Sequence, residues 1–123
     1  MNAFRSAVEA RDIEAMEAAL SPDVTFRSPA VFKPYEGRDT VMRLLRTVLE
    51  VFEDFEYTDE LAGEGTHALI FRATVGDNQV EGLDHLTLDA DGLVTELVVM
   101  VRPLSGLIAL AQEMGARLET TPG

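Results

Sequence analysis

The sequence contains no cysteine and no tryptophan among its 123 residues. A chain without cysteine forms no disulfide framework, carries no thiolate nucleophile and builds no cysteine-ligated zinc site. Basic residues are also scarce, because 10 Lys and Arg stand against 22 Asp and Glu, which gives a net charge of −12. Such a field repels phosphate backbones and anionic membrane surfaces, so we expect neither nucleic acid nor a membrane as a partner.

Long apolar runs are absent as well. No segment approaches the roughly 20 apolar residues that a membrane-spanning helix needs, and the start, MNAFRSAVEARD, lacks the basic and then apolar pattern of a secretory signal. We therefore expect a cytoplasmic protein. The length is that of one domain, which we place at residues 1–118, followed by a loose tail at 119–123.

The first half of the chain has helical periodicity. Apolar residues recur three and four positions apart, which predicts two short helices within residues 4–20, the second capped by Asp12. A short strand is predicted at 24–28 and a loop, with two prolines and a glycine, at 29–37. A third helix follows, capped by Asp39.

In the second half the period changes to two, and short turns rich in glycine, aspartate and asparagine separate the apolar segments. This pattern is typical of an antiparallel meander. Ser105 is predicted to cap a last helix that runs to about Leu118. Helices, a curved sheet and a terminal helix together indicate an α+β domain. The four predicted strands are 55–62, 67–75, 79–88 and 93–102.

One aspartate stands out on the third of these strands. Asp84 alternates with Val80, Leu86 and Leu88, so it is the lone charge on the predicted inner face of the sheet. A carboxylate there needs a raised pKa or a hydrogen-bond donor, and perturbed carboxyls in apolar cavities are candidates for functional sites. The alternative is an aspartate that reaches water at the mouth of the sheet and has no function. His85 points to the opposite face and is a weak candidate for a chemical role.

Aromatic and apolar side chains are candidates for the wall of a cavity around Asp84, although ordinary core packing is the favoured interpretation of Phe52 and Phe71. Tyr35 is a weak candidate for a hydrogen-bond donor near the cavity mouth. His67 and His85 lack metal-ligand spacing with any third residue, and no glycine-rich phosphate loop precedes a helix, so neither metal nor cofactor is expected. The ligand-binding candidates are Phe26, Ser28, Phe32, Tyr35, Phe55, Phe71, Asp84, Leu86 and Val99.

Three stretches resemble a known superfamily: ARDIEAMEAALSPDVTFRSP (10–29), YEGRD (35–39) and LDHLTLDADGLVTELVVMVRP (83–103). They are similar to the nuclear transport factor 2-like superfamily, especially its SnoaL-like branch. The resemblance implies a cone-shaped α+β barrel, in which N-terminal helices pack in a strongly curved, mainly antiparallel sheet and enclose a pocket. It also implies a homodimer through the outer face of the sheet. Function does not follow, because these folds include isomerases, polyketide cyclases, epoxide hydrolases, binding proteins and partner-docking domains.

The catalytic groups of these relatives match only in part. Asp84 matches the oxyanion-hole acid of ketosteroid isomerase, but the position of its catalytic base carries Ser28 and that of its tyrosine carries Phe4. Neither side chain replaces the missing group, so we do not expect a ketosteroid isomerase. The epoxide hydrolase pattern needs a second aspartate and an arginine, where this chain has Val99 and Gly82. Polyketide cyclases of the SnoaL type use an aspartate with few other groups, and they remain the best enzyme interpretation.

Two hypotheses stay open. In the first, an apolar pocket binds a small hydrophobic molecule with a carbonyl or hydroxyl, with or without transforming it, and Asp84 is the polar anchor or the general acid–base. In the second, the chain is a non-catalytic dimeric protein-interaction module with a vestigial pocket. The outer face of the sheet carries Ile70, Val98 and Met100, which are apolar enough to need cover and so agree with a homodimer.

Overall fold

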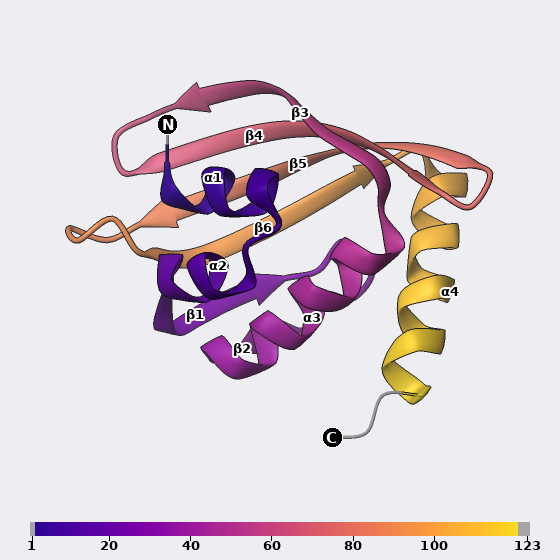
Figure 1. The fold of residues 1–123 in the computed structure, drawn as a ribbon, viewed down its shortest axis with the longest axis horizontal. Coiled ribbons are helices and arrows are strands. Elements are labelled where there is room, and N and C mark those ends of the chain that lie inside the picture. Colours follow the sequence, from indigo (N-terminus) through magenta and orange to yellow (C-terminus); the bar gives the residue numbers. More distant parts are fainter. Residues whose placement is uncertain (1, 121–123) are drawn as a thin grey trace.

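The computed structural model describes residues 2–120, which fold into four helices and one six-stranded sheet (Figure 1). The strand order is β2-β1-β6-β5-β4-β3, and the sheet is not closed. All neighbouring strands are antiparallel except β1 and β6. The predicted α+β class is therefore confirmed. The elements are α1 (Ala3–Ala10), α2 (Ile13–Ala19), β1 (Leu20–Arg27), β2 (Tyr35–Glu36), α3 (Arg38–Val51), β3 (Glu53–Ala62), β4 (Thr66–Val75), β5 (Asn78–Leu88), β6 (Val94–Arg102) and α4 (Leu104–Thr120).

The helix starts agree only partly with the predicted caps. Asp12 caps α2, because its carboxylate accepts a hydrogen bond from the backbone N–H of Ala15 at 3.1 Å. The prediction for α3 was wrong, since Gly37 occupies the cap position at φ 94° and Asp39 lies inside the first turn. There the carboxylate still stabilises the positive end of the helix. Ser105 was also wrongly predicted as a cap, because α4 already begins at Leu104.

The strands of the second half lie within two residues of their predicted bounds, and their turns place Gly65, Gly76 and Gly92 at positive φ. The segment that was predicted as a loop at 29–37 contains the short strand β2, which pairs antiparallel with β1. A two-residue strand has no periodicity to detect. The helix α4 continues to Thr120 rather than ending near Leu118, and the rest of the predicted tail, 121–123, lies outside the described residues.

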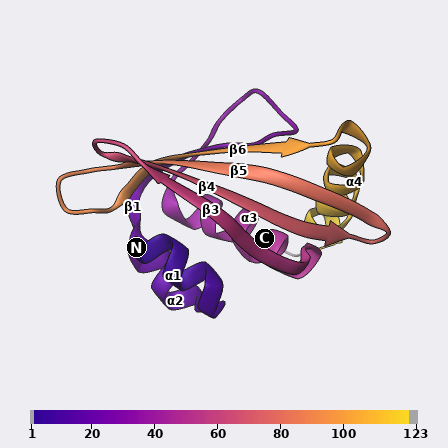
Figure 2. The same cartoon turned by 90° about the horizontal axis from the view of Figure 1, so that it is seen from above.

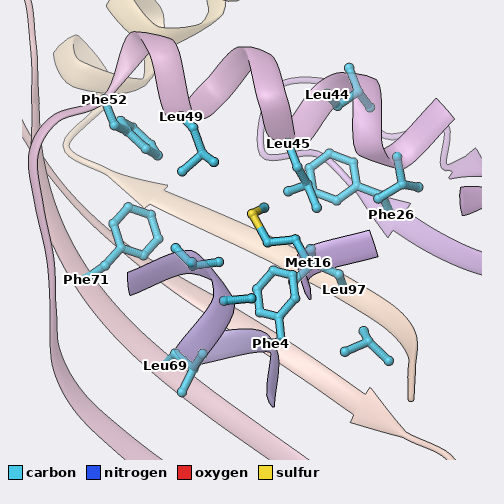
Figure 3. Close-up of a cluster of buried hydrophobic side chains, with 14 of the residues drawn as sticks. Phe4, Met16, Phe26, Leu44, Leu45, Leu49, Phe52, Leu69, Phe71 and Leu97 are labelled. Atoms are coloured by element: carbon cyan, nitrogen blue, oxygen red, sulfur yellow. The ribbon is translucent and has the colours of Figure 1, made fainter. Parts of the chain in front are cut away.

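The helices bury one face of the sheet. Figures 1 and 2 show α1 and α2 against the strands, with α4 across the end where the β4–β5 turn lies. The core between helices and sheet is almost wholly apolar, and Figure 3 shows Phe4, Met16, Leu45 and Leu97 converging in it. Within residues 2–120, no helix is long and apolar enough to span a membrane.

Candidate functional site

A cavity of about 400 Å³ lies between the inner face of the sheet and the helices. Side chains of all four helices form one wall, inward-facing residues of the six strands form the other, and the 28–31 segment also contributes. The volume is within the range of small-molecule sites, which are mostly apolar concavities with a few polar groups. The wall is rich in aromatic rings: Phe4, Phe26, Tyr35, Phe52, Phe55, Tyr57 and Phe71.

Asp84 supplies a carboxyl group to this apolar wall. The residue lies on β5 between Leu69 of β4 and Val99 of β6, and its side chain is on the helix-covered face of the sheet. Only 8% of the residue is exposed. Asp84 and Thr47 are the two buried polar or charged residues in the described part of the chain, and Thr47 is satisfied by the carbonyl of Arg43. Asp84 is thus the one buried carboxyl of residues 2–120.

Tyr57 is the side chain that hydrogen-bonds Asp84. Its hydroxyl donates to Asp84 Oδ2 at 3.3 Å, and within the described residues no other hydrogen bond to the Asp84 side chain is present. Burial raises the pKa of Asp84 to about 7, and the hydrogen bond from Tyr57 opposes this rise. Burial and the negative charge of Asp84 in turn raise the pKa of Tyr57, so the phenol stays protonated and keeps donating. Asp84 therefore changes its charge near neutral pH.

Tyr57 is itself held from two sides. Tyr57 packs edge-to-face against Phe55, with ring centroids 4.9 Å apart. The guanidinium carbon of Arg5 lies 5.4 Å from the Tyr57 ring centroid, and Arg5 forms an ion pair with Glu60 at 2.8 Å. Glu60 also contacts His67 Nδ1 at 3.1 Å, and this bond and the one from Arg5 lower the pKa of Glu60. A cluster of charges thus supports the phenol from outside the cavity lining.

Asp84 and Tyr57 lie within a region that a family model matches, whereas Val99 and the α4 side chains of the cavity lie beyond it. The model is that of the SnoaL-like domain, and it covers residues 1–97. The chain belongs to the SnoaL-like family. The resemblance to the nuclear transport factor 2-like fold is therefore confirmed. No curated protein matches the sequence.

Solved structures of other proteins are similar to this SnoaL-like chain. A steroid delta-isomerase from Pseudomonas aeruginosa is 43% identical over 95% of this chain and 87% of that chain, with a TM-score of 0.91. An uncharacterised bacterial protein with a cystatin-like fold from Silicibacter pomeroyi is 33% identical over 96% and 84%, also at 0.91. A SnoaL-like protein of unknown function from Burkholderia thailandensis is 19% identical over 82% and 90%, at 0.69, which shows the fold alone.

The structure divides the predicted site residues of this SnoaL-like protein into two groups. Phe32 is 96% exposed, Leu86 is fully buried, and neither lines the cavity. His85 is half-buried on the other face of the sheet, beside Val98 of β6. Tyr35 lines the cavity but makes no hydrogen bond to Asp84 in the described structure. The predicted residues that do meet at the cavity are Phe26, Ser28, Tyr35, Phe55, Phe71, Asp84 and Val99.

Sequence reasoning missed Tyr57, although a period of two places it on the same face as the predicted cavity residue Phe55, and the irregular pairing of β3 adds Glu60 to that face. The pairing of β3 with β4 shifts between Tyr57 and Asp59, so one extra residue interrupts the alternation of faces. Tyr57 pairs with Phe71 and Glu60 with Leu69, which brings both residues to the same face although they are three positions apart. A strict period of two puts them on opposite faces. The lone tyrosine in an acidic segment, FEYTDE, was the available signal.

Gly82 marks the place where the epoxide hydrolase pattern needs an arginine. A Cβ atom on Gly82 would clash with the ring of Phe71, 2.6 Å from its Cε2, and would lie 2.8 Å from the carbonyl oxygen of Met100. The Phe71 ring therefore covers the backbone two residues before Asp84, on the same face of β5. The Phe71 ring thus occupies the space that an arginine side chain at position 82 would need.

Among the described residues, no group of three or more His, Asp or Glu is arranged to hold a metal ion.

Proposed function

We propose that this SnoaL-like protein binds a small, largely apolar molecule in the inner cavity, with Asp84 as its polar anchor. One observation carries the proposal: a single buried carboxyl, hydrogen-bonded by Tyr57, lies in a wall that is otherwise almost wholly apolar. Cavities with this composition are the usual form of small-molecule sites. The apolar wall supplies affinity, and the carboxyl supplies orientation.

Asp84 also has the properties of a general acid–base toward the bound molecule. Its pKa of about 7 leaves both protonation states populated at neutral pH, which is the condition under which a carboxyl transfers protons most effectively in both directions. Tyr57 keeps one carboxyl oxygen occupied. The other oxygen is then the atom that accepts a proton from the ligand or returns it.

The residues at the positions that match ketosteroid isomerase support a narrower reaction class. In the resemblance to ketosteroid isomerase, the base position carries Ser28 and the tyrosine position Phe4. Ser28 Oγ accepts a hydrogen bond from the N–H of Ala30 at 3.0 Å, and Phe4 is buried in the core. Neither side chain ionises near neutral pH. We therefore propose acid–base chemistry by Asp84 alone, as in the polyketide cyclase type, rather than two-residue ketosteroid isomerisation.

A thermal-shift screen tests the binding proposal. The purified protein and the Asp84→Asn variant are heated with steroid ketones, aromatic polyketides, terpene epoxides, fatty acids and apolar amines. A ligand at about 100 times its dissociation constant adds roughly 2.7 kcal/mol to the unfolding free energy, which corresponds to a rise of several degrees. We expect a hit that is weakened in the variant. A hit of equal size in both proteins means that Asp84 is not the anchor, and silence across the library contradicts the pocket proposal.

The outer face of the sheet supports a second proposal, a homodimer. Met100 is 59% exposed there, opposite Leu83 on the neighbouring strand. These two residues and Ile70 border a shallow groove on this face, away from the Asp84 cavity. Exposed apolar patches of this kind mark interaction surfaces. If the inner cavity takes no ligand, this face makes a dimeric interaction module the better interpretation.

A further inference from the structure

Asp84 lies in a wall that holds no positive charge to match it. Among the described residues, the cavity lining includes no Lys, Arg or His side chain. The guanidinium of Arg5 contacts the ring of Tyr57 but is outside the lining, and it is already paired with Glu60 at 2.8 Å and Glu9 at 3.4 Å. A buried carboxylate without a cationic partner is costly. The partner for the ionised form of Asp84 has to come from the ligand.

Aromatic rings line the same cavity as the Asp84 carboxyl. Four rings of the lining form one cluster, with neighbouring centroids 4.9 to 5.7 Å apart: Phe52, Phe55, Tyr57 and Phe71. Tyr57 touches Asp84 directly, and Phe71 lies over Gly82 on the face that Asp84 shares. The π face of an aromatic ring attracts cations, most strongly where water is excluded. A carboxylate beside aromatic rings is therefore suited to an ammonium group.

We propose that the ligand of this cavity is a protonated amine on an apolar skeleton, with its ammonium group on Asp84 and its carbon atoms against the aromatic rings. This inference rests on the proposed function above and names its ligand class. An anionic ligand would place a second negative charge beside Asp84 with no base to offset it. The net charge of −12 also raises the local concentration of cations around the protein.

The protonation of Asp84 separates an amine from a neutral ligand. An ammonium group pairs with the carboxylate, so its affinity falls when acid protonates Asp84. A ketone accepts a hydrogen bond from the carboxylic acid, so its affinity falls when Asp84 ionises. Tyr57 also lines the cavity, and its raised pKa keeps the phenol protonated over this range. The charged groups behind Tyr57 are the same whichever ligand binds, so they do not distinguish an amine from a ketone. These groups are Arg5, Glu9, Glu60 and His67.

A matched set of four tetralins tests the inference by isothermal titration calorimetry at pH 5 and pH 8. Aminotetralin is a cation, tetralone and tetralol are neutral, and tetralin carboxylic acid is an anion, all on one skeleton. With a pKa of about 7, about 1% of Asp84 is ionised at pH 5. We expect aminotetralin to bind at least tenfold tighter than tetralol at pH 8, and to weaken by up to about a hundredfold at pH 5.

The Asp84→Asn variant is the control for the other titrating groups, including His67. It keeps the shape of the side chain and removes its charge, so we expect amine affinity that is low and nearly equal at both pH values. Tighter binding of tetralone than of aminotetralin, with affinity lost at pH 8, overturns the amine inference but leaves the proposed pocket function intact. No binding by any of the four compounds to the wild-type protein contradicts both.

Discussion

Replacement of Asp84 by asparagine isolates the cost of burying one carboxylate. Asparagine keeps the size of the side chain and an oxygen that accepts from Tyr57, so the change removes chiefly the charge. The folded-state pKa of about 7 lies above the reference value of 3.8, so between these values the folded chain binds the proton more tightly than the unfolded chain. Stability therefore falls as pH rises from about 4 to about 7.

The magnitude follows from the two pKa values. The penalty on the wild-type fold is about 4 kcal/mol at pH 8, where the carboxylate is ionised in both states, and about 1.5 kcal/mol at pH 5. Both are upper limits, because the protein around a buried charge relaxes and the residue is still 8% exposed. We expect Asp84→Asn to be more stable than the wild-type protein at pH 8, by on the order of 2–4 kcal/mol, and the gain to shrink by more than half at pH 5.

Urea denaturation at pH 5 and pH 8 measures this effect, with both proteins at the same concentration so that self-association does not shift the midpoint. On acidification from pH 8 to pH 5, the unfolding free energy of the wild-type protein should rise relative to that of the variant. A stability difference that is the same at both pH values would refute the reasoning. So would a wild-type protein that is the more stable of the two at pH 8, because Asp84 would then be a solvated or paired carboxylate.

Three further changes test other parts of the structure. Tyr57→Phe removes the hydrogen bond that lowers the pKa of Asp84, so carbon-13 NMR titration of the carboxyl should show a higher pKa, and an unchanged value contradicts the contact. Gly82→Ala should destabilise the fold by about 1–3 kcal/mol in urea, because its Cβ meets Phe71. Its control, Gly115→Ala in α4, has open space and should be neutral or stabilising, and equal losses would refute the Gly82 contact. Light scattering should give about twice the 13.5 kDa of one chain, and Met100→Glu on the outer face should give the monomer; a monomeric wild type excludes the dimer.

The fold was predictable where the pattern is periodic. Alternation along β4, β5 and β6 predicted the inner face and put Asp84 on it, because the residues around Asp84 pair in regular register, and the β5–β6 pairing shifts only after Thr87. The two-residue strand β2 was not predictable, since it depends on contact with β1 and has no pattern of its own. The start of α3 failed for a related reason. Gly37 occupies the cap position and makes no side-chain hydrogen bond to the helix, so the sequence carries no capping signal there.

The candidate site shows the same limit. Asp84 was found because a charge on an apolar face is conspicuous in the sequence. Tyr57 was missed although strict alternation puts it on the face of Phe55, a predicted cavity residue, and only the irregular pairing after Tyr57 was hidden from the sequence, which brings Glu60 to the same face. Phe32 was included because aromatic side chains are candidates for the wall of an apolar cavity, yet its ring lies almost wholly in solvent. Contacts between distant segments decide these positions.

The central claim is that the polar group of a ligand binds Asp84 inside the cavity. A crystal structure of the protein with the strongest ligand from the screen measures this directly. The account predicts ligand density between α4 and the sheet, with one polar ligand atom within hydrogen-bonding distance of Asp84, roughly 2.6–3.2 Å. A ligand bound on the outer face, or one that lies in the cavity with its polar group away from Asp84, would contradict it.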